Sequence, residues 1–91
     1  MSGGVKVMPQ QIDDLVRAAE WQYFTVFDKC TIAVCKLPSG FVLTESSACI
    51  SPSNYDFELG KSICRDRIIN RLWELEGYRL QTEVSNFERQ Q

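Results

Sequence analysis

The chain has 91 residues, a formal net charge of −2 and a sequence pI near 5.0. This balance argues against duplex DNA as a partner, because domains that hold DNA through its phosphates carry a basic excess or a basic stripe. A chain of this length has one core and buries only about 60–65% of its unfolded surface, so assembly into a homo-oligomer would add stability.

No stretch approaches the ~18 consecutive apolar residues that a membrane span requires. The first five residues, MSGGV, also lack the basic start and apolar run of a signal peptide. We therefore expect neither membrane contact nor export from the compartment in which the protein is made.

The cysteine pattern does not favour a metal site. The spacing is C-x4-C-x13-C-x14-C, without the close C-x2-C pairs of zinc ribbons, and the chain has no His to complete a mixed site. In a reducing compartment we expect free thiols, at least two of them in the core, with no metal and no cofactor. The four residues are Cys30, Cys35, Cys49 and Cys64.

The start of the chain divides into an arm and a helix. Residues 1–10 contain Gly and show no periodicity, so they are predicted to form a flexible arm. Apolar residues then recur at helical spacing, which predicts a short amphipathic helix over about residues 9–21, with Pro9 in its first turn. A single domain is expected over residues 11–85, followed by a solvated tail at 86–91.

Residues 23–47 are rich in aromatic and β-branched side chains and predict strands. Turn signals at residues 28–29 and 38–40 divide this stretch into three strands, for which an antiparallel meander is the simplest layout. In the middle strand neither alternating face is cleanly polar, so both faces are expected to be covered at least in part.

A long helix is predicted from roughly Asp56 to Glu76. Ser53 or Asn54 could cap its first amides, and Gly77 is the expected C-cap. Residues 78–84 would then form a last strand or a second short helix. The expected fold class is α+β: a short N-terminal helix, a small antiparallel β-meander and one long C-terminal helix.

Apolar residues occupy two sides of this long helix, which indicates burial against the sheet and against a second surface, naturally a partner subunit. Gly60 costs ~1 kcal/mol relative to Ala inside a helix. Its presence indicates close approach of a strand, another backbone or a ligand.

Two interpretations of the cations on this helix remain open. Lys61 and Arg65 fall within or beside an apolar stripe, and their stems could simply lie over apolar surface while their charges reach water or acids such as Glu58. Alternatively they form an anion pocket at a subunit interface. The candidate ligand-binding residues for that pocket are Tyr55, Lys61, Arg65, Arg67 and Asn70, in which the cations hold phosphate, Tyr55 stacks on a base and Asn70 forms hydrogen bonds.

Catalysis is not expected. Without His, triads of the Ser-His or Cys-His kind cannot be assembled within one chain. The acidic residues sit where solvated helix ends and faces usually carry them, and no Gly-rich phosphate loop is present. We name no catalytic residue and expect a protein that binds.

Three segments resemble a family of small tailed-phage proteins, whose founding members were known as the products of gene 49 and gene 66 in two phages. They are PSGFVLTESSACISPSNYD at 38–56, ELGK at 58–61 and LWELEGYRL at 72–80, and the resemblance extends over residues 23–80. The strand-then-helix plan is also similar to that of the Thoeris anti-defence proteins, phage proteins that sequester a cyclic ADP-ribose signal in pockets between subunits. Where family members often carry Glu-Asn, this chain has RDRIIN at 65–70 and is more basic.

The resemblance implies a phage-encoded counter-defence protein in the cytoplasm of the infected bacterial host. It would act by stoichiometric binding and sequester a cyclic nucleotide immune signal in a homo-oligomer. One alternative is an inhibitor that binds a host enzyme or defence complex, and another is a minor virion accessory protein.

Overall fold

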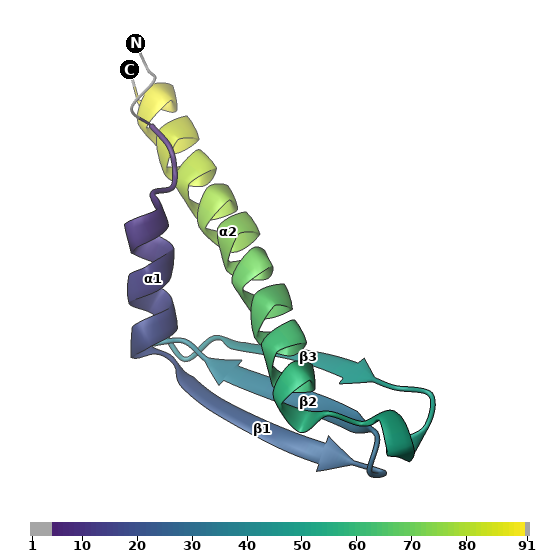
Figure 1. The fold of residues 1–91 in the computed structure, drawn as a ribbon. Helices are drawn as coiled ribbons and strands as arrows, with labels where there is room; N and C mark the ends of the chain where they lie inside the picture. The colour runs from purple at the N-terminus through teal and green to yellow at the C-terminus, as the bar shows by residue number, and fades with distance from the viewer. Residues whose placement is uncertain (1–4, 91) are drawn as a thin grey trace.

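The computed structural model describes residues 5–90. The elements follow in the order α1 (Pro9–Ala18), β1 (Glu20–Val26), β2 (Cys30–Lys36), β3 (Val42–Ala48), a 3-10 turn at Pro52–Asn54, and α2 (Phe57–Arg89). Figure 1 shows the sheet at one end of the molecule, with α2 rising from it and α1 running beside α2. The predicted α+β class and its order of elements are confirmed.

The sheet is an antiparallel meander with the strand order β1-β2-β3. Each pair of strands is in register over seven residues, from Glu20↔Lys36 to Val26↔Cys30 and from Cys30↔Ala48 to Lys36↔Val42. The first hairpin closes through Phe27 and Asp28, whose φ angles are 56° and 57°. A two-residue turn in which both residues have positive φ matches the right-handed twist of the strands that it joins.

The short helix ends earlier than predicted. It stops at Ala18, and Trp21, which the periodicity had placed in it, lies in β1. The helix begins at Pro9, where the Met8 backbone N–H donates to Gln11 Oε1 at 2.6 Å. Of the predicted flexible arm, residues 1–4 lie outside the described part of the chain, whereas Val7 packs against the core and Pro9 is already helical.

The long helix starts and ends elsewhere than predicted. Its N-cap is Asp56, whose Oδ1 accepts from the Leu59 backbone N–H at 3.1 Å, so neither Ser53 nor Asn54 caps it. The predicted end at Gly77 is wrong, because α2 continues to Arg89 and leaves no separate strand or helix after residue 77. Gly77 does not have the positive φ of a C-cap glycine, and ion pairs one turn apart, from Arg79 to Glu76 and Glu83, stabilise the helix across this point.

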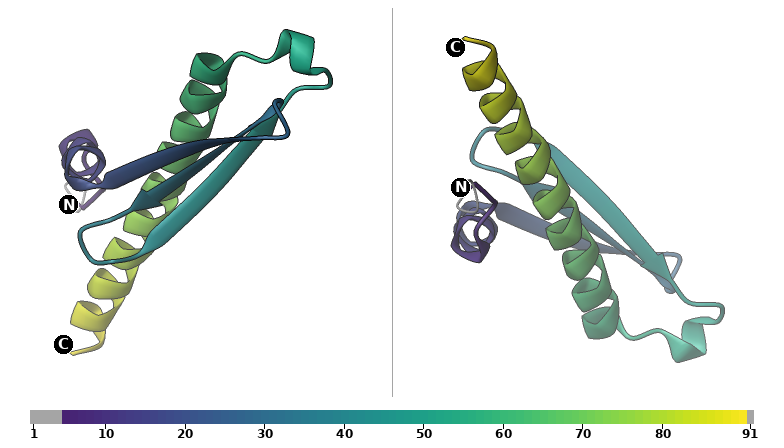
Figure 2. Two further views of the ribbon diagram at one scale, coloured as in Figure 1. Left: turned by 90° about the horizontal axis from the view of Figure 1, so that it is seen from below. Right: turned by 90° about the horizontal axis from the view of Figure 1, so that it is seen from above.

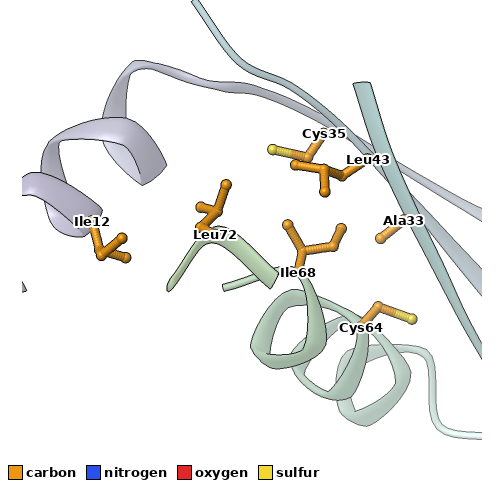
Figure 3. Packing of buried hydrophobic residues seen from close by; sticks show 7 residues of the cluster. All are labelled: Ile12, Ala33, Cys35, Leu43, Cys64, Ile68 and Leu72. Carbon is orange, nitrogen blue, oxygen red and sulfur yellow. The ribbon is translucent and has the colours of Figure 1, made fainter. Parts of the chain in front are cut away.

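The core lies between α2, one face of the sheet and α1. Figure 3 shows Ile68 of α2 pointing toward the strands, with Ile12 of α1 beside Leu72. Among residues 5–90 seven hydrophobic residues are buried: Ile12, Ala33, Cys35, Leu43, Cys64, Ile68 and Leu72. Gly60 is buried over β2, where a Cβ would lie 2.1 Å from Thr31 Oγ1, so the close helix–strand approach expected from this glycine is present.

The opposite face of the sheet is not covered within the described chain. Phe24 and Val42 on that face are 47% and 50% exposed, and Ile32 and Val34 of the central strand are only partly buried. The expectation that both faces are covered therefore fails for a single subunit. Within residues 5–90, neither α1 nor α2 combines the length and the hydropathy that a membrane-spanning helix needs.

All four cysteines are free thiols, and two of them, Cys35 and Cys64, are buried as expected. Burial raises the pKa of both thiols. The positive charge of Arg65 offsets part of this rise for Cys35, and that of Arg67 offsets part of it for Cys64. The stability that these protonated thiols contribute is complete below the ordinary pKa of 9.0 and is lost as the pH rises through the higher pKa of the folded state.

We expect iodoacetamide at pH 8 to label the half-buried Cys30 and Cys49 at least about tenfold faster than Cys35 and Cys64, because only thiolates that reach solvent react. Peptide mass spectrometry over a time course measures the four rates. In denaturant all four thiols should react alike, which is the control. Native labelling of Cys64 as fast as that of Cys49 would contradict the packing described here.

Candidate functional site

The side of α2 that faces β1 carries a cluster of two cations above three aromatic rings. We call this cluster the ledge and define it by Trp21, Tyr23, Phe57, Lys61 and Arg65. Trp21 and Tyr23 alternate along β1 on the face toward α2, and their rings stack with centroids 6.2 Å apart and planes 11° apart. Lys61 and Arg65 are one turn apart on α2, so both extend over the same strand.

The rings of the ledge hold the cations in place. Lys61 Nζ lies 5.2 Å from the ring centroids of both Tyr23 and Phe57, and Arg65 Cζ lies 4.8 Å from that of Trp21. Trp21 is itself fixed, because its Nε1–H donates to the carbonyl oxygen of Val16 at 3.1 Å. Contacts of this kind are worth about 0.5–1 kcal/mol where they are exposed and more where they are desolvated. The aromatic floor therefore orders two positive charges at a partly exposed surface.

The two cations differ in what else they contact. Lys61 forms an ion pair with Glu58 at 3.5 Å, which fits the interpretation of a stem over apolar surface and a charge near an acid. Arg65 is exposed and makes no ion pair or hydrogen bond to any other residue in the range 5–90. Its guanidinium donors are thus directed to solvent, and a planar guanidinium held in one orientation is suited to a phosphate or carboxylate.

Arg67 does not join the ledge. It lies on the β3 side of α2, where its Nη1 donates to the Ser46 carbonyl oxygen at 2.7 Å. Arg71, one turn further, donates to the Thr44 carbonyl oxygen at 3.1 Å and pairs with Glu45 at 3.5 Å. These two arginines join the helix to the edge of β3 by hydrogen bonds. The guanidinium of Arg67 therefore already has a backbone carbonyl as its partner.

Tyr55 and Asn70 are not part of the ledge. The Tyr55 hydroxyl is hydrogen-bonded to Thr25 Oγ1 at 2.9 Å and to Thr31 Oγ1 at 2.7 Å, which satisfies the buried Thr31. Tyr55 lines a small cavity of about 140 Å³ that has an acid, Asp56, and no cation among its lining residues. Asn70 is exposed two residues after the buried Ile68, hence about 200° around the helix.

The structure thus brings together two of the five predicted ligand-binding residues, Lys61 and Arg65. Arg67 and Asn70 lie on other sides of α2, and the hydroxyl of Tyr55, although close to the ledge at Thr25, is already hydrogen-bonded to two threonines. Sequence reasoning missed the aromatic floor. The alternation of Trp21 and Tyr23 in a strand would have indicated it, but extending the first helix to residue 21 concealed that pattern. Within residues 5–90 no three Cys, Asp or Glu side chains gather in a way that could hold a metal ion.

Comparison with known protein families gives a match over most of the chain. A family model described as "Phage protein (N4 Gp49/phage Sf6 gene 66) family" matches residues 7–84, a range that includes all three strands and every residue of the ledge. No curated protein and no solved structure was found to match the chain.

Proposed function

Because the chain belongs to this phage protein family, we propose that it acts in the cytoplasm of the infected host as a counter-defence protein that binds and sequesters an anionic nucleotide signal. Binding would be stoichiometric, without catalysis. The observation that carries the proposal is the ledge, in which Arg65 is held on Trp21 with its donors free and Lys61 stands one turn away.

The ledge offers what a nucleotide phosphate needs at a surface. Two cations on one side of a helix can bind one phosphate between them, and charge-assisted hydrogen bonds to a guanidinium are worth about 1.5–3 kcal/mol. The floor of stacked rings fixes the side chains before the ligand arrives, which lowers the entropy lost on binding. Aromatic rings beside the cations also provide apolar surface for a base or ribose.

We expect Arg65→Ala to weaken nucleotide binding about 10- to 100-fold, because it removes the free guanidinium. Lys61→Ala should weaken it less, since Glu58 already competes for that charge. Isothermal titration calorimetry against cyclic ADP-ribose, cyclic di-GMP and cyclic AMP measures both effects. Binding should also weaken as salt is raised, because the site is exposed.

Arg79→Ala is the matched control. It removes the same charge from the same helix, but Arg79 is paired with Glu76 and Glu83, which raise its pKa, and it lies nearly four turns beyond Arg65. The Arg79→Ala variant should bind the nucleotide with the same affinity as the unmodified chain. The proposal would be wrong if none of the three nucleotides binds, or if Arg79→Ala weakens binding as much as Arg65→Ala does.

A second candidate is a protein inhibitor of a host enzyme or defence complex. It is favoured by the uncovered face of the sheet, where the apolar side chains Phe24, Ile32, Val34 and Val42 lie together on adjacent strands. A pull-down from host lysate distinguishes the two functions, because an inhibitor should retain a stoichiometric protein and ignore nucleotides. A minor virion accessory protein, the third alternative, should instead co-purify with phage particles.

A further inference from the structure

The two edge strands of the sheet, β1 and β3, differ in their contacts with the rest of the chain. At β3, Arg67 and Arg71 reach from α2 to the carbonyl groups of Ser46 and Thr44, so charged side chains lie along that edge. Charges of this kind keep an edge strand from pairing with another chain. No such device is present at β1 within the described residues.

The open edge of β1 has the properties of a strand that pairs. It runs for seven residues without a bulge, in unbroken register with β2, and it contains neither Pro nor Lys. Its one charged residue, Glu20, stands at the first position and is paired with Lys36 at 3.3 Å. The backbone of α2 packs mainly on β2 and β3, and its side chains extend over the inner face of β1 without covering the outer edge of that strand. Figure 2 shows β1 at one edge of the sheet, next to β2.

We propose that β1 pairs antiparallel with β1 of a second copy about a two-fold axis perpendicular to the sheet. The partner is a second copy because this strand is complementary to itself: with Tyr23 at the axis, each Trp21 is opposite Thr25, each Gln22 opposite Phe24 and each Glu20 opposite Val26. No like charges face each other in this register, and an aromatic pair forms at its centre. The result is a six-stranded sheet with both α2 helices on the same face.

This pairing would bring the two ledges together, and to that extent it rests on the proposed function. Neighbouring strands lie about 4.8 Å apart, so the two Tyr23 rings and the two Lys61 side chains above them would adjoin at the axis. Each Arg65, held over Trp21, would lie farther from the axis, one on either side. Four cations over one aromatic floor repel one another unless an anion lies between them. The site of a single chain is therefore half of a site for a ligand with two phosphates, and that ligand should promote pairing.

A charge-exchange experiment tests the register directly. Gln22 and Phe24 are exposed on the face away from α2 and belong to no part of the ledge. In Gln22→Lys with Phe24→Lys, each new lysine stands opposite a lysine of the partner subunit. In Gln22→Lys with Phe24→Glu, each lysine stands opposite a glutamate. We expect the first variant to associate at least tenfold more weakly than the second by sedimentation velocity, with and without cyclic di-GMP.

Hydrogen exchange provides a second measurement that does not depend on mass. Amides of residues 20–26 that point away from β2 should exchange slowly in the unmodified protein and in the lysine–glutamate variant, and rapidly in the double-lysine variant. Val42→Lys places a charge on the same face of the sheet but at the β3 edge. It should change neither the association measured by sedimentation nor the hydrogen exchange of residues 20–26. Equal association of the two double variants, or a monomeric unmodified protein at every cyclic di-GMP concentration tested, would overturn the pairing.

Failure of the pairing and failure of the proposed function give different results. If a nucleotide binds with Arg65-dependent affinity to a monomer, the pairing is wrong and the ligand site stands. If the protein pairs through β1 but binds none of the nucleotides, the pairing stands and the sequestration function falls.

Discussion

Replacing Gly60 with alanine is expected to lower the free energy of unfolding by about 2–3 kcal/mol. Alanine normally stabilises a helix by ~1 kcal/mol relative to glycine. Here its Cβ would lie 2.1 Å from Thr31 Oγ1 and 2.8 Å from Thr31 Cβ, so either the strand or the helix must move. Overpacking of a core costs about 1–3 kcal/mol, and displacing Thr31 also breaks its hydrogen bond with Tyr55.

Gly77→Ala in the same helix is the matched control for Gly60→Ala. Nothing lies within 4 Å of a Cβ built at Gly77, and its φ is not positive. This substitution should therefore raise stability by about 0.5–1 kcal/mol. Urea unfolding followed by far-ultraviolet circular dichroism gives both values, and two changes of the same sign would contradict the close approach of α2 to β2.

Truncating Ile68 to alanine should destabilise the protein by about 3–4 kcal/mol. Ile68 is completely buried and points from α2 to the face of the sheet that carries Ala33, Cys35 and Leu43 (Figure 3). Losing three carbon atoms there removes their transfer free energy and leaves a cavity, which together cost about 2–5 kcal/mol for an aliphatic residue. A small domain has only about 5–15 kcal/mol in total, so the loss should be evident in its thermal midpoint.

Ile50→Ala removes the same atoms at a residue that is 95% exposed. We expect it to change the free energy of unfolding by less than about 0.5 kcal/mol. Calorimetry or urea unfolding of the two variants side by side separates burial from side-chain chemistry. An Ile68 variant as stable as the Ile50 variant would mean that α2 does not pack on the sheet in this way.

The strands and the existence of both helices could be predicted because each depends on local patterns. Alternation and turn residues mark the meander, and apolar spacing marks the helices. The end of α2 could not be predicted in this way. Gly77 is a common stop signal, but the free energy of continuing the helix, with Arg79 paired on both sides, outweighs the cost of one glycine.

The site could be predicted only in part for a related reason. Helical spacing placed Lys61 and Arg65 on one side of α2, and the structure agrees. Spacing could not show that Arg67 would reach a carbonyl of β3, or that the Tyr55 hydroxyl would be used by two threonines. Those contacts join residues 21 to 30 positions apart, and they depend on how the helix crosses the sheet.

The sequence by itself determined the fold class, the phage family and the paired cations of the long helix, because short-range patterns and motifs carry that information. The tertiary structure alone decided which aromatic rings lie beneath those cations, which arginines are taken up by the edge of β3, and which edge of the sheet is left open. The physical reason is that these outcomes depend on the position of α2 across the strands. That position is set by the buried contact of Gly60 with Thr31 and by the packing of Ile68, both of which join distant parts of the chain.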